Sequence, residues 1–138
     1  MIVKHSHTVN HYDALNLTKL DVLDTFDEIP IATGYRVDGQ VLEYFPADLE
    51  VLSRVEVIYT TLPGWSQSTT GITEWEKLPE NARKYVAFIE DYLKGSKKDG
   101  PKCKYIGTGK HIYHHSYAPH FLILIGILGP KREDTIFR

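Results

Sequence analysis

The sequence has little of several features that mark particular classes of protein. It contains one cysteine, Cys103, which cannot form an intramolecular disulfide and suits a reducing compartment. Its formal net charge is only -2, with acidic and basic residues interspersed, so no basic face is expected for a nucleic-acid backbone. The start, MIVKHSHTVN, lacks the apolar run of a signal peptide, and FLILIGIL is far shorter than the ~20 residues that a bilayer requires. We therefore expect a cytoplasmic protein with no nucleic-acid or membrane partner.

The hydrophobic pattern predicts a single domain. A chain of 138 residues with 42% hydrophobic and 25% charged residues is large enough to bury one core. Residues 14–23, ALNLTKLDVL, are predicted to form a buried strand. Residues 31–37 and 41–45 flank Asp38-Gly39, a pair that supplies the positive φ angles of a tight turn. These two segments are therefore predicted to form a β-hairpin.

A long amphipathic helix is predicted later in the chain, over residues 79–94. Pro79 suits a first helical turn and Gly95 suits the end of a helix. One apolar stripe runs along the predicted helix: Ala82, Tyr85, Val86, Ile89 and Leu93. Strands are predicted on either side of it, at 55–62 and, as the last strand, at 102–106. The fold class predicted from this pattern is α/β.

Thr18-Lys19-Leu20-Asp21 ends the first predicted strand, at the edge where open α/β sheets place their ligands. The carboxylate of Asp21 can accept two parallel hydrogen bonds from N1–H and the N2 amino group of guanine, whereas adenine presents an acceptor at N1. The aliphatic stem of Lys19 can cover the face of a base. An ordinary strand end with a solvated lysine explains the same four residues, and on them alone it is the better interpretation.

Glycines and histidines provide the other candidate sites. Gly107-Thr108-Gly109 can bring backbone N–H groups close to a ligand, because glycine lacks the side chain that blocks the approach; a plain turn is the alternative. Neither histidine group has a nearby cysteine, and Asp13 is the one adjacent acid, so we predict no metal site. These groups are His5, His7 and His11, and His111, His114, His115 and His120. No phosphate-loop or nucleophile-elbow motif occurs, so no catalytic residue is predicted.

Six segments in register resemble one enzyme family. In order they read LTKLDVLD, YFPADLEVL, VEVIYTTLPGW, Thr70-Gly71, LPENARKYVAFIE and KYIGTG. The chain is similar to the carboxyl-terminal part of eukaryotic adenylosuccinate synthetase over nearly all of residues 1–109 and again over 130–138. The resemblance implies part of a synthetase fold like that of P-loop NTPases, with a mixed sheet. In this family GTP, with Mg²⁺, phosphorylates the 6-oxygen of IMP, and the amine of L-aspartate displaces the phosphate.

The resemblance also implies roles for the candidate residues. Lys19, Leu20 and Asp21 would recognise the guanine of GTP, while Gly107, Thr108 and Gly109 would line the other side of the base. The phosphate loop, catalytic Asp and His, and aspartate-binding loop of the family have no counterpart here, so catalytic and Mg²⁺-binding residues would lie outside this chain. The complete enzyme would be a homodimer, and this chain alone would be inactive. The alternative is a non-catalytic GTP-binding or subunit-interaction module derived from that enzyme.

Two places depart from the family pattern in length or identity. Asn10-His11 stands where the family usually has Asn followed by Gly, and the loop over residues 94–101 is longer. We expect these two departures to affect the local backbone geometry and not the resemblance as a whole.

Residues 110–129 interrupt the resemblance altogether. Without them the chain reads KYIGTGPKREDTIFR, which continues the family pattern. Gly109-Lys110 can be encoded as GGTAAG, a splice donor, and Leu128-Gly129 as TTAGGT, which ends an intron in AG. The segment is a whole number of codons, so its retention keeps the frame. We therefore predict that 110–129 is a translated intron within a single partial domain, and neither a metal site nor a membrane anchor.

Overall fold

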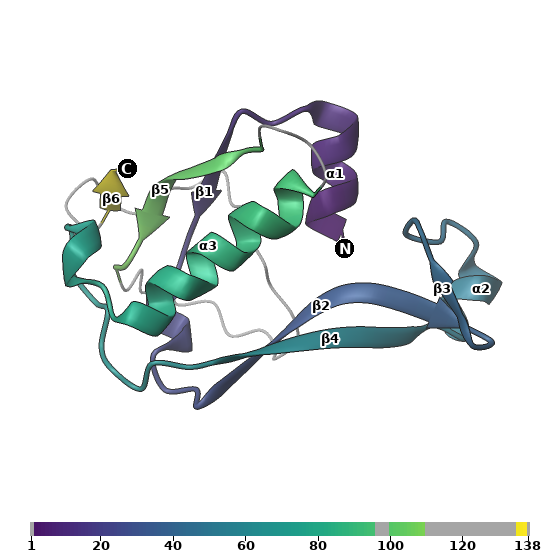
Figure 1. Cartoon of the computed structure of the whole chain (residues 1–138), viewed down its shortest axis with the longest axis horizontal. Coiled ribbons are helices and arrows are strands. Elements are labelled where there is room, and N and C mark those ends of the chain that lie inside the picture. The colour runs from purple at the N-terminus through teal and green to yellow at the C-terminus, as the bar shows by residue number, and fades with distance from the viewer. Residues whose placement is uncertain (1, 96–99, 110–134, 138) are drawn as a thin grey trace, which may run out of the picture.

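The computed structural model describes residues 2–95, 100–109 and 135–137, which form two three-stranded sheets with helices packed between and around them (Figure 1). The first sheet has the order β1-β5-β6: β1 (Ala14–Leu17), β5 (Lys102–Gly107) and β6 (Thr135–Phe137). The second has the order β3-β2-β4: β3 (Gln40–Leu42), β2 (Glu28–Val37) and β4 (Glu56–Pro63). Strands β1 and β5 are parallel and the other pairs are antiparallel. The predicted α/β class is confirmed.

Helix α3 (Glu80–Lys94) packs across the first sheet and corresponds to the predicted helix. Pro79 immediately precedes it, and Gly95, at φ 56°, ends it by donating its N–H to the Asp91 carbonyl at 3.1 Å. Of the predicted stripe, four residues are buried and Ile89 is half-buried. Glu90 is buried as well, because its carboxylate accepts hydrogen bonds at 2.9 Å from the Cys103 backbone N–H and from Lys102 Nζ. These bonds fasten α3 to β5.

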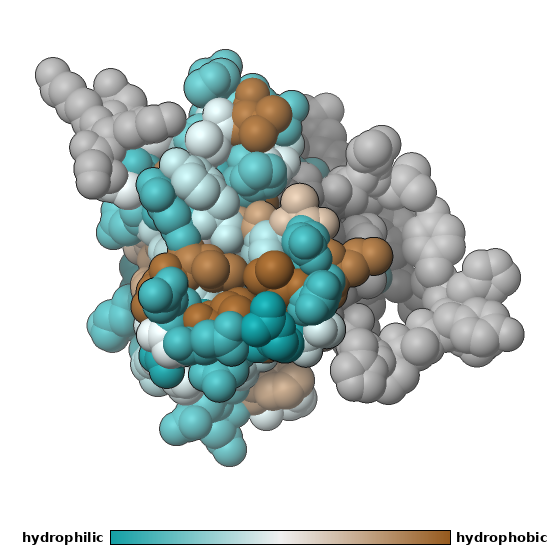
Figure 2. All heavy atoms as spheres, turned by 90° about the vertical axis from the view of Figure 1, so that its right-hand side faces the viewer, coloured by the Kyte–Doolittle hydropathy of each residue, from teal (hydrophilic) through white to brown (hydrophobic). Residues whose placement is uncertain are grey.

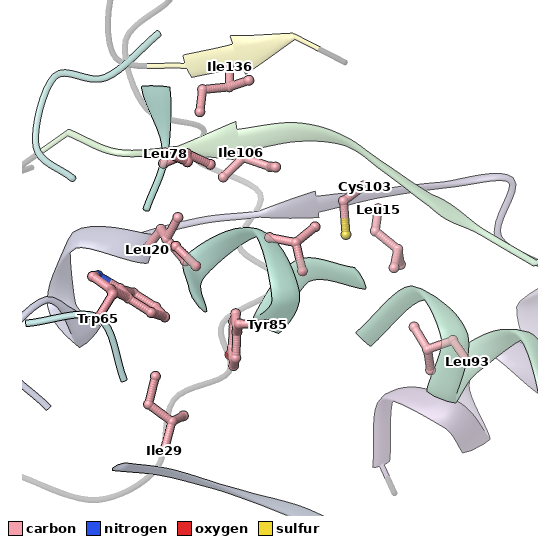
Figure 3. Close-up of a cluster of buried hydrophobic side chains, with 12 residues drawn as sticks. Leu15, Leu20, Ile29, Trp65, Leu78, Tyr85, Leu93, Cys103, Ile106 and Ile136 are labelled. Atoms are coloured by element: carbon pink, nitrogen blue, oxygen red, sulfur yellow. The ribbon is translucent and has the colours of Figure 1, made fainter. Parts of the chain in front are cut away.

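The hydrophobic core lies between α3 and the first sheet (Figure 3). Leu15 of β1, Ile106 of β5 and Val86 of α3 meet there with exposed fractions of 8% or less. The rings of Trp65 and Tyr85 contact edge to face, with centroids 6.0 Å apart. Burial, and to a lesser extent Cys103, raises the pKa of the Tyr85 phenol, so this ring stays neutral inside the core.

The β-hairpin predicted at Asp38-Gly39 forms the end of a long two-stranded arm. Asp38 and Gly39 have φ angles of 49° and 82°, the left-handed pair that a type I′ turn requires. Strands β2 and β4 extend along the arm beneath α3 (Figure 1), and the Tyr92 hydroxyl of α3 donates to the Thr33 carbonyl of β2 at 2.6 Å. The strand predicted at 55–62 is confirmed as β4.

The far end of the arm carries exposed apolar side chains. Figure 2 looks at this face and shows a band of hydrophobic atoms across it. Val41 of β3 is 66% exposed and Leu49 of the short helix α2 (Leu49–Ser53) is 80% exposed. Asp48 caps α2 by accepting hydrogen bonds from the N–H groups of its first turn. Exposed apolar surface of this kind favours aggregation of the isolated chain.

The structure corrects the first predicted strand. Strand β1 ends at Leu17, because Lys19 adopts the left-handed conformation at φ 57° and ψ 45° and turns the chain into the 3-10 helix η1 (Leu20–Leu23). The strand at 102–106 is confirmed as β5, but it is not the last strand, because β6 pairs with it. Helix α1 (Ile2–Asn10), α2 and the 3-10 helix η2 (Trp75–Lys77) were not predicted. The predicted insert at 110–129 lies outside the described residues.

No helix in the described ranges is long and apolar enough to cross a membrane.

The departure from the family pattern at His11 falls on a strained backbone position. His11 follows α1, has φ 53° and donates its N–H to the His7 carbonyl at 2.8 Å, the arrangement that glycine favours after a helix. His11→Gly is therefore expected to stabilise the chain by about 1 kcal/mol in urea unfolding. The matched control, His5→Gly on the exposed side of α1, should destabilise it by a similar amount. A destabilising His11→Gly would contradict this assignment.

Candidate functional site

The parallel pairing of β1 and β5 brings the two predicted halves of the site together. Leu17 is in register with Ile106, so the residues that follow each strand leave the same edge of the sheet. Lys19, Leu20 and Asp21 follow β1, while Gly107, Thr108 and Gly109 end or follow β5. Helix η1 also contacts β5 directly. Segments more than eighty residues apart in the sequence are thus neighbours.

The three residues after β1 lie in different surroundings. Lys19 is exposed and marks the left-handed turn. Leu20 is 1% exposed and packs in the core, so its backbone is the part that can face a ligand. Asp21 is half-buried in the first turn of η1, and its carbonyl accepts a hydrogen bond from the Asp24 N–H at 3.2 Å. Lys19 and Asp21 therefore flank Leu20, whose side chain is anchored in the core. The turn thus carries an exposed ammonium group on one side of this anchor and a carboxylate on the other.

The turn after β5 is buried and fixed by hydrogen bonds. Gly107, Thr108 and Gly109 are all buried, and Thr108 is 0% exposed. The Thr108 hydroxyl donates to the Ile72 carbonyl at 2.8 Å, and the Gly71 N–H donates to the Thr108 carbonyl at 3.2 Å. Because these bonds engage both the side-chain hydroxyl and the backbone carbonyl of Thr108, the turn has a defined position beside η1.

The partners of this turn belong to residues 64–72, which we name the bridging loop. Its other end is held by Asp24, at the end of η1. The Asp24 carboxylate accepts hydrogen bonds from Trp65 Nε1 at 2.8 Å, from the Thr69 N–H at 2.7 Å and from Thr69 Oγ1 at 2.8 Å. Sequence reasoning assigned no role to Asp24 or Thr69, although neighbouring residues Thr70-Gly71 belong to the family-like segments.

This edge of the sheet offers a ligand two kinds of hydrogen-bonding group: the carboxylate of Asp21 and the backbone of the Gly107-Thr108-Gly109 turn. In the described ranges no three His, Cys, Asp or Glu residues are grouped so that they could hold a metal ion. His7 is buried against the ring of Tyr12, at 6.2 Å between centroids, in a packing role. The second histidine group, His111, His114, His115 and His120, lies outside the described residues.

Comparison with known proteins gives the family. The family model of adenylosuccinate synthetase matches residues 1–114. The chain belongs to the adenylosuccinate synthetase family. The match ends inside residues 110–129, the segment predicted to be an insert.

Similar synthetases agree over most of this chain. Curated adenylosuccinate synthetases of Schizosaccharomyces japonicus and Uncinocarpus reesii are 54% and 52% identical to it over 109 residues, which is 79% of this chain and 24% of each relative. The solved structure of fully ligated adenylosuccinate synthetase from Plasmodium falciparum is 29% identical, with a TM-score of 0.74, and the match covers 98% of this chain and 27% of that one. The chain thus spans about a quarter of the length of the synthetases it matches.

Proposed function

We propose that this chain is the part of adenylosuccinate synthetase that recognises the guanine base of GTP. The observation that carries the proposal is the parallel β1–β5 pair, whose register leads Asp21 and the Gly107-Thr108-Gly109 turn to one edge of the sheet. For the complete enzyme we infer the activity that its family implies, a GTP-dependent ligase that joins IMP and L-aspartate in AMP biosynthesis.

Asp21 supplies the selectivity for guanine in this proposal. Its carboxylate accepts hydrogen bonds from N1–H and the N2 amino group, and hydrogen bonds to a charged acceptor contribute about 1.5–3 kcal/mol each. Adenine places an unprotonated N1 at the same point, which leaves the carboxylate without a donor. The exposed stem of Lys19 covers one face of the base, while Gly107, Thr108 and Gly109 line the other side. GTP is therefore accepted and ATP rejected.

The complete enzyme would act in the cytoplasm as a homodimer, with GTP, IMP and L-aspartate as substrates. Catalytic residues and the Mg²⁺ ligands would lie in the remaining three quarters of the length of its relatives.

The isolated chain is expected to form no adenylosuccinate, because phosphoryl transfer needs a phosphate loop and a metal that this sequence does not supply. A chimera, in which this chain replaces the matching part of the Schizosaccharomyces japonicus synthetase, should instead be active with GTP and inactive with ATP. Product formation is followed by absorbance for both proteins. Turnover by the isolated chain, or a folded chimera that uses ATP as well as GTP, would contradict the proposal.

A further inference from the structure

We propose that Asp24 is a positioning residue for guanine recognition: its carboxylate holds the bridging loop, which sets the spacing between the two halves of the site. The inference rests on the proposed function and adds a residue that need not touch the nucleotide.

The hydrogen bonds to Asp24 require two acceptor oxygens, which a carboxylate provides and the amide of asparagine, a neutral side chain of the same shape, does not. Three donors converge on its two oxygens: the Trp65 indole N–H and the Thr69 hydroxyl on Oδ1, and the Thr69 backbone N–H on Oδ2. Trp65 is 5% exposed and Thr69 is 0% exposed, so water cannot replace the carboxylate as their acceptor. The indole and backbone N–H groups are donors only, which requires an acceptor on both oxygens.

A continuous series of hydrogen bonds joins one half of the site to the other through this carboxylate. The Asp24 N–H donates to the Asp21 carbonyl at 3.2 Å, on the β1 side. Asp24 holds Thr69, and the Thr69 carbonyl accepts a hydrogen bond from the Ile72 N–H at 3.1 Å. The Ile72 carbonyl in turn accepts the Thr108 hydroxyl at 2.8 Å, on the β5 side. Displacing Thr69 therefore releases the support of Thr108.

Recognition of a base from two sides depends on the spacing of those sides. If Asp24 fixes that spacing, its loss weakens GTP binding while the groups that perform the chemistry, outside this chain, stay in place. The kinetic consequence is a higher KM for GTP with little change in kcat or in the KM for IMP and L-aspartate. A residue that served only general stability would instead lower the amount of active enzyme, and so alter kcat without affecting KM.

The test uses Asp24→Asn in the chimera. Whichever way the asparagine amide is turned, its NH₂ group faces a donor that the aspartate oxygen had accepted. We expect the KM for GTP and the Kd for GDP to rise about tenfold, the effect of losing one good hydrogen bond, with kcat within about twofold. The matched control is Asp27→Asn, because Asp27 is exposed and its carboxylate accepts a hydroxyl hydrogen bond, from Ser66 Oγ at 3.0 Å, in the same loop. That hydroxyl can rotate to accept from the amide, so no change is expected.

Variants of Thr69 keep the inference testable should Asp24→Asn fail to fold. Thr69→Ser retains both donors and should behave like the unchanged chimera, whereas Thr69→Val loses the hydroxyl and should raise the KM for GTP several-fold. An unchanged KM for GTP in Asp24→Asn and Thr69→Val would overturn the inference. An equal increase in the KM values for GTP, IMP and L-aspartate would overturn it as well. The proposed function is judged separately by Asp21→Asn: if that variant keeps its preference for GTP, guanine recognition itself is wrongly placed.

Discussion

Asp21→Asn in the chimera is expected to lower kcat/KM for GTP by about 10²-fold and to favour xanthosine triphosphate relative to GTP. Asparagine keeps the shape of aspartate but replaces one acceptor by a donor, which then faces the N2 amino group of guanine. Two donors left in contact cost about 1–3 kcal/mol or more inside a closed site. Xanthine carries a carbonyl at C2, which accepts a hydrogen bond from the new amide. The measurement is kcat/KM for both nucleotides with each variant.

Asp27→Asn is the control for this substitution, because it makes the same chemical change on an exposed residue nearby. It should leave the ratio of GTP to xanthosine triphosphate use unchanged. An Asp21→Asn chimera with the unaltered ratio would show that Asp21 does not read the base.

Gly64→Ala is expected to destabilise the chain by about 3 kcal/mol or more, the upper range for overpacking a fixed site. A Cβ on Gly64 would lie 1.7 Å from the Phe26 carbonyl oxygen and 2.7 Å from its carbon. The backbone cannot withdraw easily, because the Gly64 N–H donates to the Asp27 carbonyl at 2.7 Å and its carbonyl accepts from Asn81 of α3 at 2.6 Å. Urea unfolding followed by circular dichroism measures the loss.

Gly39→Ala provides the comparison for Gly64→Ala. Gly39 has open space around its Cβ position, and only its φ of 82° opposes alanine, which corresponds to about 1–2 kcal/mol. Gly64→Ala should therefore unfold at a clearly lower urea concentration than Gly39→Ala. The reverse order would mean that the contact with Phe26 is relieved by local movement.

Local signals in the sequence predicted those elements whose structure depends on local chemistry. The Asp38-Gly39 pair predicts the hairpin because both positions need positive φ angles. The apolar stripe with Pro79 and Gly95 predicts α3, since a helix must bury one face. Strand β4 follows from the alternating, β-branched residues at 55–62.

Elements that depend on distant contacts were missed or misjudged. The run of apolar residues at 14–23 conceals the turn at Lys19, because a left-handed lysine has no sequence signature. Helix α1 is rich in histidine and lacks an acidic first turn, so its pattern is weak. The role of Asp24 depends on partners about forty residues away, which no local pattern reveals. The prediction that 110–129 is a translated intron falls outside the described residues and stays a prediction.

The candidate site shows the same division between local and distant information. The resemblance singled out Lys19, Leu20, Asp21 and the Gly107-Thr108-Gly109 turn, and the β1–β5 register places these segments side by side. What the sequence did not indicate is that the bridging loop joins these two segments, because its hydrogen bonds reach residues far away in the sequence.

The most direct test of guanine recognition at this edge is a crystal structure of the chimera with bound GDP. We predict that both carboxylate oxygens of Asp21 lie within hydrogen-bonding distance, about 2.7–3.2 Å, of N1 and N2 of the base. The base should lie between Lys19 and the turn at Gly107-Thr108-Gly109. A guanine bound in the chimera with no contact to either segment would contradict the proposal.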